Sequence, residues 1–376
     1  MQLEQRRWEA EKGWNRPSTL DGAQLVLVFG SPAALCNSDR LGELRGAYSG
    51  SSLFGCSTAG EICGVQVTDD SLVSTAIHFD STTFRTALSH VGESGESFAA
   101  GKHLAETLGT TGLTHVFVLS DGLRINGTEL VRGLTEHLPS SVTITGGLAG
   151  DGARFQTTWV LSDGKPQSGV VAALGFYGRN LTVGCASLGG WDPFGPDRLI
   201  TRSKGNILYE LDGKSALDLY KHYLGEHSKE LPASGLLFPL SLRTEGADTR
   251  VVRTILAVSE IDQSITFAGD VPEGSYAQLM KANFDRLIEG ATGAARTSIG
   301  AGAGFSPELA ILVSCVGRKL VLKQRVEEEV EGVREVVGSR TVLAGFYSYG
   351  EISPFTPGSR CELHNQTMTI TALSER

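Results

Sequence analysis

Short apolar runs closed by small and acidic residues recur three times along this chain. Residues 53–61 read LFGCSTAGE, residues 144–151 read ITGGLAGD and residues 343–351 read LAGFYSYGE. Each motif begins with aliphatic or β-branched residues, turns on glycine and ends on a carboxylate. Apolar runs of this length, bounded by turn residues, are typical of strands buried on both faces. Such self-similarity indicates a fold built from repeated units, which we number copies one to three.

A second apolar run precedes each motif, at residues 25–29, 116–119 and 311–313. The spacing from the small residue that closes this run (Gly30, Ser120 or Cys315) to the acid is 31 residues in copies one and two (61 − 30 and 151 − 120) and 36 in copy three (351 − 315). The intervening segment has helical period. In copy three one helix face would carry Leu322, Val326, Val330, Val333 and Val337.

Strand–helix–strand units of this kind pair their strands in parallel through a right-handed crossover. The three glycine-rich turns would then follow the carboxyl ends of strands, where open α/β sheets bind their ligands. We therefore expect the three turns to converge on one polar pocket.

Alternating residues after copies one and two predict two-stranded extensions. Residues 64–68 and 72–79 would form one hairpin, and residues 157–161 and 170–177 another. The pattern predicts an α/β protein of two domains, with mixed sheets and flanking helices built from repeated βαβ-plus-hairpin units. Residues 1–20 are expected to form a peripheral helix or a loose leader.

Glycine and proline mark a break at residues 189–204, which read GGWDPFGPDRLITRSK. We therefore divide the chain into a leader (1–21), a first domain (22–188), a linker (189–205) and a second domain (206–376). Helices are expected at residues 96–108 with Ser94 as a cap, at residues 215–224 with Asp212 as a cap, and at residues 276–288. Glycines cluster from residue 290 to residue 304.

Composition narrows the function. The net charge of −9 gives no basic footprint for nucleic acid, and a hydrophobic fraction of 40% excludes a disordered chain. The six cysteines include no CxxC pair, which favours a reducing compartment. The N-terminal residues lack the apolar core of a signal peptide, and no run approaches the roughly 20 apolar residues that cross a bilayer. We expect a cytoplasmic protein with no membrane insertion.

The stretch FGCSTAGE at residues 54–61 resembles the signature of the FIST family, named from F-box and intracellular signal transduction proteins. Four later stretches are similar to the C-terminal domain of that family: NILYELDGKSALDLYKHYLG (206–225), SCVGRKLVL (314–322), GFYSYGEISP (345–354) and LHNQTMTI (363–370). The resemblance covers about residues 22–372, with the motifs in the family's order.

The resemblance implies a sensory module rather than an enzyme. The family is thought to bind small ligands, with amino acids as the leading suggestion, and some relatives are implied to bind haem and sense nitric oxide. Members work beside histidine kinases, diguanylate cyclases or chemoreceptors. This chain shows no such output segment, so we expect it to signal through a separate partner such as a histidine kinase or diguanylate cyclase.

The three acids that end the motifs are the first candidates for a binding site. Glu61, Asp151 and Glu351 could hold a ligand ammonium or amide N–H, because charge-assisted hydrogen bonds are strong. Alternatively each carboxylate caps its own turn through backbone N–H groups.

Neighbouring donors could bind a ligand carboxylate. The hydroxyl groups are Ser57, Thr58, Ser348 and Tyr349. Backbone N–H groups at glycines such as Gly147 could form an anion-binding nest, or these glycines could serve only close strand approach. Arg318, at the end of a strand, is the better arginine for a carboxylate clamp.

Two residues suggest other functions. Cys56 would be the nucleophile of a thiol-dependent enzyme, although no histidine lies near it in sequence and buried inert cysteine is common. His364 is the candidate axial ligand if haem binds; otherwise it is a structural histidine bonded with Asn365. No other cofactor is expected, and a scaffold that binds only protein is the remaining alternative.

Overall fold

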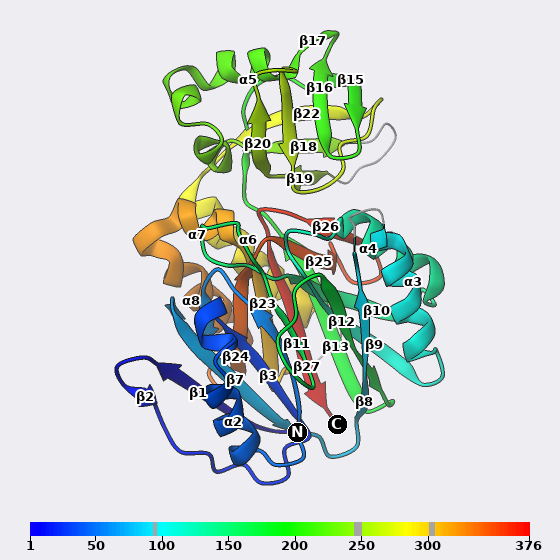
Figure 1. Cartoon of the computed structure of the whole chain (residues 1–376), viewed down its shortest axis with the longest axis vertical. Coiled ribbons are helices and arrows are strands. Elements are labelled where there is room, and N and C mark those ends of the chain that lie inside the picture. Colours follow the sequence, from blue (N-terminus) through cyan, green and yellow to red (C-terminus); the bar gives the residue numbers. More distant parts are fainter. Residues whose placement is uncertain (93–95, 244–249, 301–304) are drawn as a thin grey trace.

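The computed structural model describes residues 1–92, 96–243, 250–300 and 305–376. In that part of the chain the strands form three six-stranded sheets and one nine-stranded sheet. The six-stranded sheets and their helices make up the body, and the nine-stranded sheet belongs to a small domain at residues 192–281. Figure 1 shows the small domain, in green and yellow-green, above the body, with both termini at the far end of the body.

The body sheets share one plan. The first has the order β11–β4–β3–β7–β1–β2, the second β26–β25–β10–β9–β12–β8 and the third β13–β27–β23–β24–β5–β6. The bounds in the first sheet are β1 Gln2–Glu9, β2 Gly13–Trp14, β3 Leu25–Gly30, β4 Ser52–Ser57, β7 Ser71–His78 and β11 Val160–Ser162. Those in the second are β8 Thr83–His90, β9 Leu113–Ser120, β10 Thr143–Leu148, β12 Val170–Tyr177, β25 Gly350–Pro354 and β26 Cys361–His364. Those in the third are β5 Glu61–Cys63, β6 Gln66–Thr68, β13 Leu181–Leu188, β23 Leu309–Cys315, β24 Val342–Ser348 and β27 Met368–Glu375.

Each sheet contains one copy of the repeat. The parallel pairs are β3–β4, β9–β10 and β23–β24, and β7, β12 and β27 run antiparallel to the first strand of each pair. The crossover helices are α2 Ser38–Ala47, α4 Gly127–His137 and α8 Val326–Val337. Short helices α1 Pro32–Leu35 and α7 Val316–Leu322 follow β3 and β23, with a 3₁₀ turn at Lys323–Arg325. Helix α3 Ser97–Leu108 packs on α4, and α6 Phe284–Ile299 packs on α8. The predicted α/β fold class is confirmed.

The strand that follows each turn crosses into a neighbouring sheet. Strand β5 pairs with β24 of copy three, β11 with β4 of copy one, and β25 with β10 of copy two. The three copies are therefore joined in a ring by exchanged strands. Aromatic contacts fill the centre between sheets, with ring centroids 4.7 Å apart for Phe29 and Phe346 and 6.4 Å for Phe54 and Phe117.

One glycine marks the equivalent position in all three copies. Gly55, Gly146 and Gly345 each sit in the second parallel strand, against the backbone of the first. A Cβ atom there would lie 1.7, 1.8 and 2.0 Å from the carbonyl oxygens of Val28, Val118 and Leu312, respectively. Only glycine allows this approach. The structure thus explains why each motif carries a glycine after its apolar run.

When the three copies are aligned on this glycine, their acids no longer fall at the same position. Counting from the shared glycine places Glu61 and Glu351 six residues along, and Gly152 at the same position of copy two. Asp151 therefore lies one residue out of step with the other two acids.

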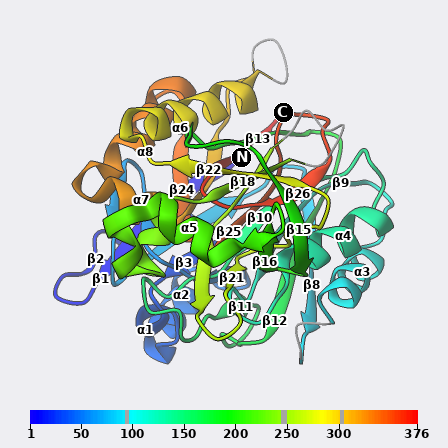
Figure 2. The same ribbon diagram turned by 90° about the horizontal axis from the view of Figure 1, so that it is seen from above.

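The small domain lies between copies two and three in the chain. Its strands are β14 Asp192–Pro193, β15 Arg198–Lys204, β16 Ile207–Leu211, β17 Lys214–Ser215, β18 Leu240–Arg243, β19 Val251–Arg253, β20 Ile255–Ser259, β21 Ser264–Phe267 and β22 Tyr276–Lys281. Helix α5 Ala216–Leu224 and 3₁₀ turns at Gly225–Glu230 and Ala233–Leu237 cover it, and it has its own apolar core. Figure 2 shows it lying over the central part of the body. The segment predicted as a linker, residues 189–205, carries β14 and β15.

Several local expectations were wrong. Residues 2–9 form strand β1, antiparallel to β7, because Glu4 and Gln5 are buried with specific partners, among them Tyr48 and the carbonyl oxygen of Leu343. The polar residues of this strand concealed it in the sequence.

The two predicted hairpins also have different partners. Strand β6 pairs with β5, while β7 is buried over almost its whole length and pairs with β3 and β1. Strand β12 pairs with β8 and β9 rather than with β11. An apolar strand that is covered on both faces belongs inside a sheet, not in an extension.

Residues 276–288 begin as strand β22 of the small domain and become helix α6 of the body only at Phe284. Helix α5 is found as predicted, but its cap is Ser215, whose hydroxyl accepts from the N–H of Asp218. Ser94 and residues 301–304 of the glycine cluster lie outside the described residues. Within those residues, no helix has the length and apolar character required to cross a membrane.

Candidate ligand-binding cleft

The three glycine-rich turns meet at the centre of the body. Backbone hydrogen bonds join them pairwise: Ala59 N–H to Tyr347 O (2.8 Å), Gly150 N–H to Ser57 O (2.9 Å) and Tyr349 N–H to Leu148 O (3.1 Å). The turns thus come together as the spacing predicts, but they bind one another.

The carboxyl groups of Glu61 and Glu351 form matching buried networks. Glu61 accepts from the hydroxyl of Thr58 and from the N–H and hydroxyl of Ser71. Glu351 accepts from the Ser348 hydroxyl (2.6 Å) and from the N–H and hydroxyl of Thr367 (3.2 and 3.0 Å). Burial raises the pKa of Glu61 to about 7 and that of Glu351 to about 8. Glu61 thus bonds to its own turn and to the first residue of β7, and Glu351 bonds to its own turn and to the residue just before β27.

Asp151 closes a different turn. Its carboxylate accepts from the N–H groups of residues 155, 156 and 157 at 2.8–3.0 Å, and from the hydroxyl of Tyr349. The ring of Tyr349 stacks on Phe155 with centroids 4.5 Å apart. Copy two thus uses its acid as a turn cap, which follows from the one-residue offset.

Arg318 is fully buried beside Glu329. Its Nε and Nη2 donate to one carboxylate oxygen of Glu329 at 2.9 and 2.7 Å, and its remaining donors reach the carbonyl oxygens of Gly189 and Leu287. The other carboxylate oxygen accepts from the Tyr347 hydroxyl at 2.7 Å. All three nitrogens of this guanidinium are engaged within the protein.

The remaining candidates of copies one and two are also enclosed. The Ser57 hydroxyl accepts from the Trp159 N–H at 2.9 Å. A Cβ at Gly147 would lie 2.6 Å from Val313, so this glycine serves close packing between the second and third sheets. Cys56 is wholly buried on β4, and burial raises the pKa of its thiol well above the usual value. A buried neutral thiol lacks the thiolate character of a nucleophile.

His364 and Asn365 lie directly after Leu363 at the end of β26. The Nε2 atom of His364 is 2.8 Å from the carbonyl oxygen of Ser353, and burial lowers the pKa of the imidazole to about 4. Its Nδ1 and both amide atoms of Asn365 are buried without a hydrogen-bond partner among the described residues. Internal hydrogen bonds already occupy most of these residues. Their role in ligand binding stays a prediction.

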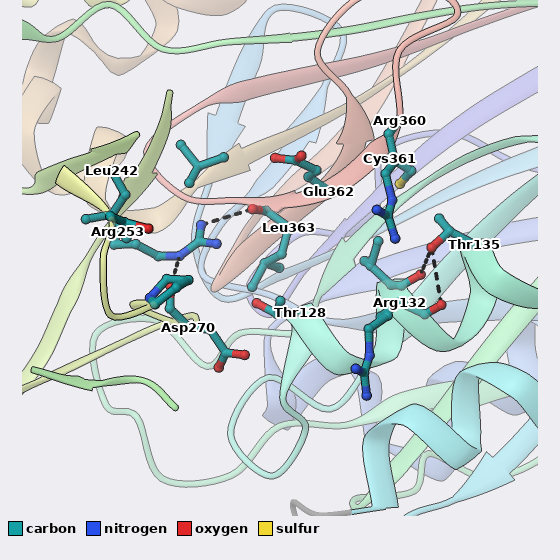
Figure 3. Close-up of a pocket in the computed structure, with 14 residues that line it drawn as sticks. Thr128, Arg132, Thr135, Leu242, Arg253, Asp270, Arg360, Cys361, Glu362 and Leu363 are labelled. Atoms are coloured by element: carbon teal, nitrogen blue, oxygen red, sulfur yellow. Dashed lines mark hydrogen bonds between the residues drawn. The ribbon is translucent and has the colours of Figure 1, made fainter. Parts of the chain in front are cut away.

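A cavity of about 310 Å³ lies elsewhere, between the body and the small domain. Helix α4 and strand β26 form its body side, and β18, β19 and residues 270–275 form its small-domain side (Figure 3). We call it the cleft. Its polar lining consists of Thr128, Arg132, Thr135, Arg253, Asp270, Ser275, Arg360 and Glu362. Its volume is at the lower end of the range for small-molecule sites, roughly 300–1,000 Å³.

Arg253 is the most deeply buried charge in this lining, with 5% of its surface exposed. Its Nε donates to the Asp270 carbonyl oxygen at 3.0 Å, and its Nη1 to the carbonyl oxygens of Val252 and Leu363 at 3.3 and 3.1 Å. Burial lowers its pKa to about 10, which still leaves the guanidinium charged at neutral pH.

Other charges of the cleft are only partly engaged. Arg132 pairs with Glu129 at 2.6 Å and lies over the Phe98 ring. One oxygen of Asp270 accepts from the Asn126 side chain at 3.1 Å. The side chains of Arg360 and Glu362 form no hydrogen bond or ion pair with any described residue. Charges of both signs are thus available to a ligand.

Two of these contacts join the two parts of the molecule. The Arg253–Leu363 hydrogen bond links β19 to β26, and the Asn126–Asp270 hydrogen bond links the cap of α4 to the loop after β21. A molecule in the cleft would contact groups on both sides.

Sequence reasoning missed every charged residue of the cleft. One signal was available: Arg253 interrupts the apolar strand sequence VVRTILAV, which indicates a charge with a specific buried role. Arg360 and Glu362 flank Cys361 in a stretch that shows no other pattern.

The cleft does not fit haem. Its described lining contains no histidine, methionine or tyrosine. The sulfur atom in this lining belongs to Cys361. Its thiol donates to the carbonyl oxygen of Ile144 at 3.4 Å, and burial raises the pKa of this thiol well above the usual value. Among the residues that the structure describes, no group of three or more His, Cys, Asp or Glu side chains is placed to hold a metal ion.

The fold and the cleft define a class: an α/β protein with a ring-like repeated body, an inserted small domain and a charged cleft between them. Residues 24–214 match the FIST N domain and residues 216–354 match the FIST C domain. The chain belongs to the FIST family, whose domains are associated with sensing in signal transduction. This confirms the resemblance of the sequence motifs.

A curated relative is the uncharacterized protein MJ1623 of Methanocaldococcus jannaschii, 24% identical over 307 residues. The match covers 74% of this chain and 57% of that protein, so the chain spans little more than half of the relative's length. A crystal structure of cyanuric acid hydrolase from A. caulinodans aligns over 94% of this chain and 90% of that one, with 9% identity and a TM-score of 0.33. A likeness at that level indicates nothing about function.

Proposed function

We propose that this protein is a cytoplasmic sensor in signal transduction that binds a small polar metabolite, in the first place an amino acid, in the cleft. It acts by binding, without turnover and without a cofactor. The observation that carries the proposal is the cleft itself: a cavity of about 310 Å³ lined by arginine and carboxylate side chains from both parts of the molecule.

The charges favour a small zwitterion. An amino acid presents a carboxylate and an ammonium group a few bonds apart, and the lining offers arginines for the first and Asp270 and Glu362 for the second. Charge-assisted hydrogen bonds are about twice as strong as neutral ones and orient the ligand. The central turns, by contrast, offer carboxyl groups that are already bonded.

Signalling follows from the position of the cleft. A ligand that contacts β19 of the small domain and also α4 or β26 of the body favours arrangements in which the small domain and the body are close. It can shift the population of these arrangements only by its difference in affinity for them. A separate partner, such as a histidine kinase or a diguanylate cyclase, would recognise the favoured arrangement.

A thermal-shift screen against the twenty amino acids tests the proposal. A ligand present at about 100 times its dissociation constant stabilises the folded state by about 2.7 kcal/mol, so at least one amino acid should raise the melting temperature measurably. The control variant Arg340→Gln changes an exposed arginine between α8 and β24 and should respond like the wild type. A screen without any shift would overturn the amino-acid proposal and favour a scaffold that binds only protein.

Cys56→Ala separates binding from thiol chemistry. The substitution removes a wholly buried sulfur from the first sheet, so it should lower stability by about 1 kcal/mol. The dissociation constant of the amino acid found in the screen should not change. A loss of binding with an unchanged fold would contradict the placement of the site in the cleft.

A further inference from the structure

Arg253 is a buried cation without a carboxylate partner. Only 5% of its surface is exposed, and its hydrogen bonds to described residues go to the backbone carbonyl oxygens of Val252, Asp270 and Leu363. No described carboxylate lies within ion-pair distance of it, whereas the fully buried Arg318 is paired with Glu329 and the buried Arg6 lies over the ring of Trp14. Burying a charge is costly unless it is paired, so an unpaired buried guanidinium indicates a role toward an anion.

Its remaining donor is available to a ligand. Nη2 of Arg253 donates to no described group, and the side chain lines the cleft, reaching from the small domain towards the body (Figure 3). Thr128, on the body side, also lines the cleft, and its buried hydroxyl has no hydrogen-bond partner among the described residues. Arg360 supplies a third unengaged donor group on the body side.

We propose that Arg253 anchors a carboxylate of the ligand, with Arg360 and the hydroxyl of Thr128 as further donors. This inference rests on the proposed function and specifies its ligand class: a small molecule with a free carboxylate. Thr128 also lies in the first turn of α4, where the helix dipole favours an anion. A planar guanidinium matches the two oxygens of a carboxylate, which a lysine ammonium does not.

The neighbouring acids select a carboxylate over a phosphate. Asp270 and Glu362 are the acidic groups that act on Arg253 through space. They would repel a dianion more strongly than a monoanion, and they can receive the ammonium group of a zwitterion. The site therefore prefers a singly charged oxyanion next to a cation.

Carboxylate binding also has a mechanical consequence. Arg253 belongs to the small domain and already bonds to Leu363 O in the body. An anion shared by Arg253 on one side and Arg360 and Thr128 on the other would add bonds across the same junction. The anchor is thus the residue through which ligand binding holds the small domain to the body.

Calorimetric titration of the full chain tests the anchor. The probes are the amino acid with the largest thermal shift, its α-carboxamide, acetate, succinate and inorganic phosphate. The proteins are the wild type, Arg253→Lys, Arg360→Gln and the control Arg340→Gln. We expect the carboxamide, Arg253→Lys and Arg360→Gln each to weaken binding tenfold or more, since a hydrogen bond to a charged group carries that much affinity. Arg340→Gln and the wild type should bind alike, and phosphate should bind more weakly than acetate.

The outcomes separate this inference from the proposed function. If no amino acid binds but acetate or succinate binds and is lost in Arg360→Gln, the carboxylate anchor stands and the amino-acid proposal falls. If the carboxamide binds as tightly as the acid, or if Arg360→Gln or a folded Arg253→Lys variant keeps full affinity, the carboxylate site formed by Arg253 and Arg360 is overturned while the sensor proposal stands. Absence of binding by every carboxylate overturns both. Arg360 is exposed, so this variant remains informative even if Arg253→Lys fails to fold.

Discussion

Glu351 is a carboxyl group whose ionisation opposes folding. Burial raises its pKa from the usual 4.5 to about 8, although Ser348 and Thr367 donate to it. Its folded state therefore holds a proton that the unfolded state releases above pH 4.5. Between these two values the folded protein binds more protons than the unfolded chain, so stability falls as pH rises.

The pH dependence gives a prediction for Glu351. The free energy of unfolding should decline from about pH 5 to pH 8, with Glu61 adding to the decline up to about pH 7. The contribution is on the order of 1.4 kcal/mol per unit of pKa difference. Glu351→Gln replaces the protonated acid by a neutral amide of the same shape, so its denaturation midpoints should depend less on pH than those of the wild type.

Glu375 provides the opposite case as a control. Burial acts to raise its pKa, but donation from the backbone N–H groups of residues 80–82 and from the hydroxyl of Ser81 lowers the pKa to about 2, so the group loses its stabilising effect only in acid. Glu375→Gln should therefore leave the decline between pH 5 and pH 8 unchanged. A flat stability profile over that range in the wild type would contradict the buried, protonated state of Glu351.

Individual residues of the site were only partly predictable. The sequence places Glu61 and Glu351 correctly at the ends of converging turns, because their strands and glycines are local features. It could not show that Ser71 and Thr367 bond to these acids, since those donors lie 10 and 16 residues further along the chain, at the start of β7 and just before β27. Nor could it show that Asp151 is one residue out of step, because the three copies align on the glycine that contacts the first strand and not on the acid that ends each motif.

At the level of elements, the three parallel pairs depend on close strand contact at one glycine each. Gly55→Ala should therefore destabilise the fold, because its Cβ would lie 1.7 Å from the carbonyl oxygen of Val28 and the strands would have to separate. Overpacking of this kind costs about 1–3 kcal/mol or more. Chemical denaturation monitored by circular dichroism measures the change.

A matched glycine provides the comparison. Gly42 is exposed within helix α2, and a Cβ atom at this position would meet no other atom within 4 Å. Gly42→Ala should stabilise the protein by about 0.5–1 kcal/mol, because alanine loses less conformational entropy in a helix. If both substitutions had the same effect, the close contact of β3 and β4 would not limit the residue at position 55.

Element type was predictable where one pattern dominated. The apolar runs of β3, β4, β9, β10, β23 and β24 predicted parallel strands, and α8 showed its buried face at helical spacing. Residues 276–288 combined two patterns: Ala277 and Leu279 alternate as in a strand, and the helix starts only after Asn283. A single helical interpretation of that segment hid the boundary.

The molecule as a whole is closed by strands that leave their own copy. Because β5, β11 and β25 each complete a neighbouring sheet, no copy forms its sheet alone. This exchange was not visible in the sequence, since antiparallel pairing partners at long range leave no local signal. The hairpin interpretation was the nearest local alternative, and it failed for that reason.

The cleft was unpredictable for a similar reason. Its lining comes from four separate parts of the chain: α4, β19 with its neighbours, the loop near Asp270, and residues 360–363. No single sequence motif contains residues from two of these four segments. The small domain had to be placed over the body before these charges could be recognised as one site (Figure 2).

Hydrogen–deuterium exchange with and without a mixture of the twenty amino acids tests the placement of the ligand site most directly. If the ligand binds in the cleft, backbone exchange should slow at residues 126–135, 268–275 and 360–364, on both sides of the junction, and stay unchanged at residues 57–61 and 347–351. Slowing confined to those two central turns, with the cleft segments unaffected, would contradict the account.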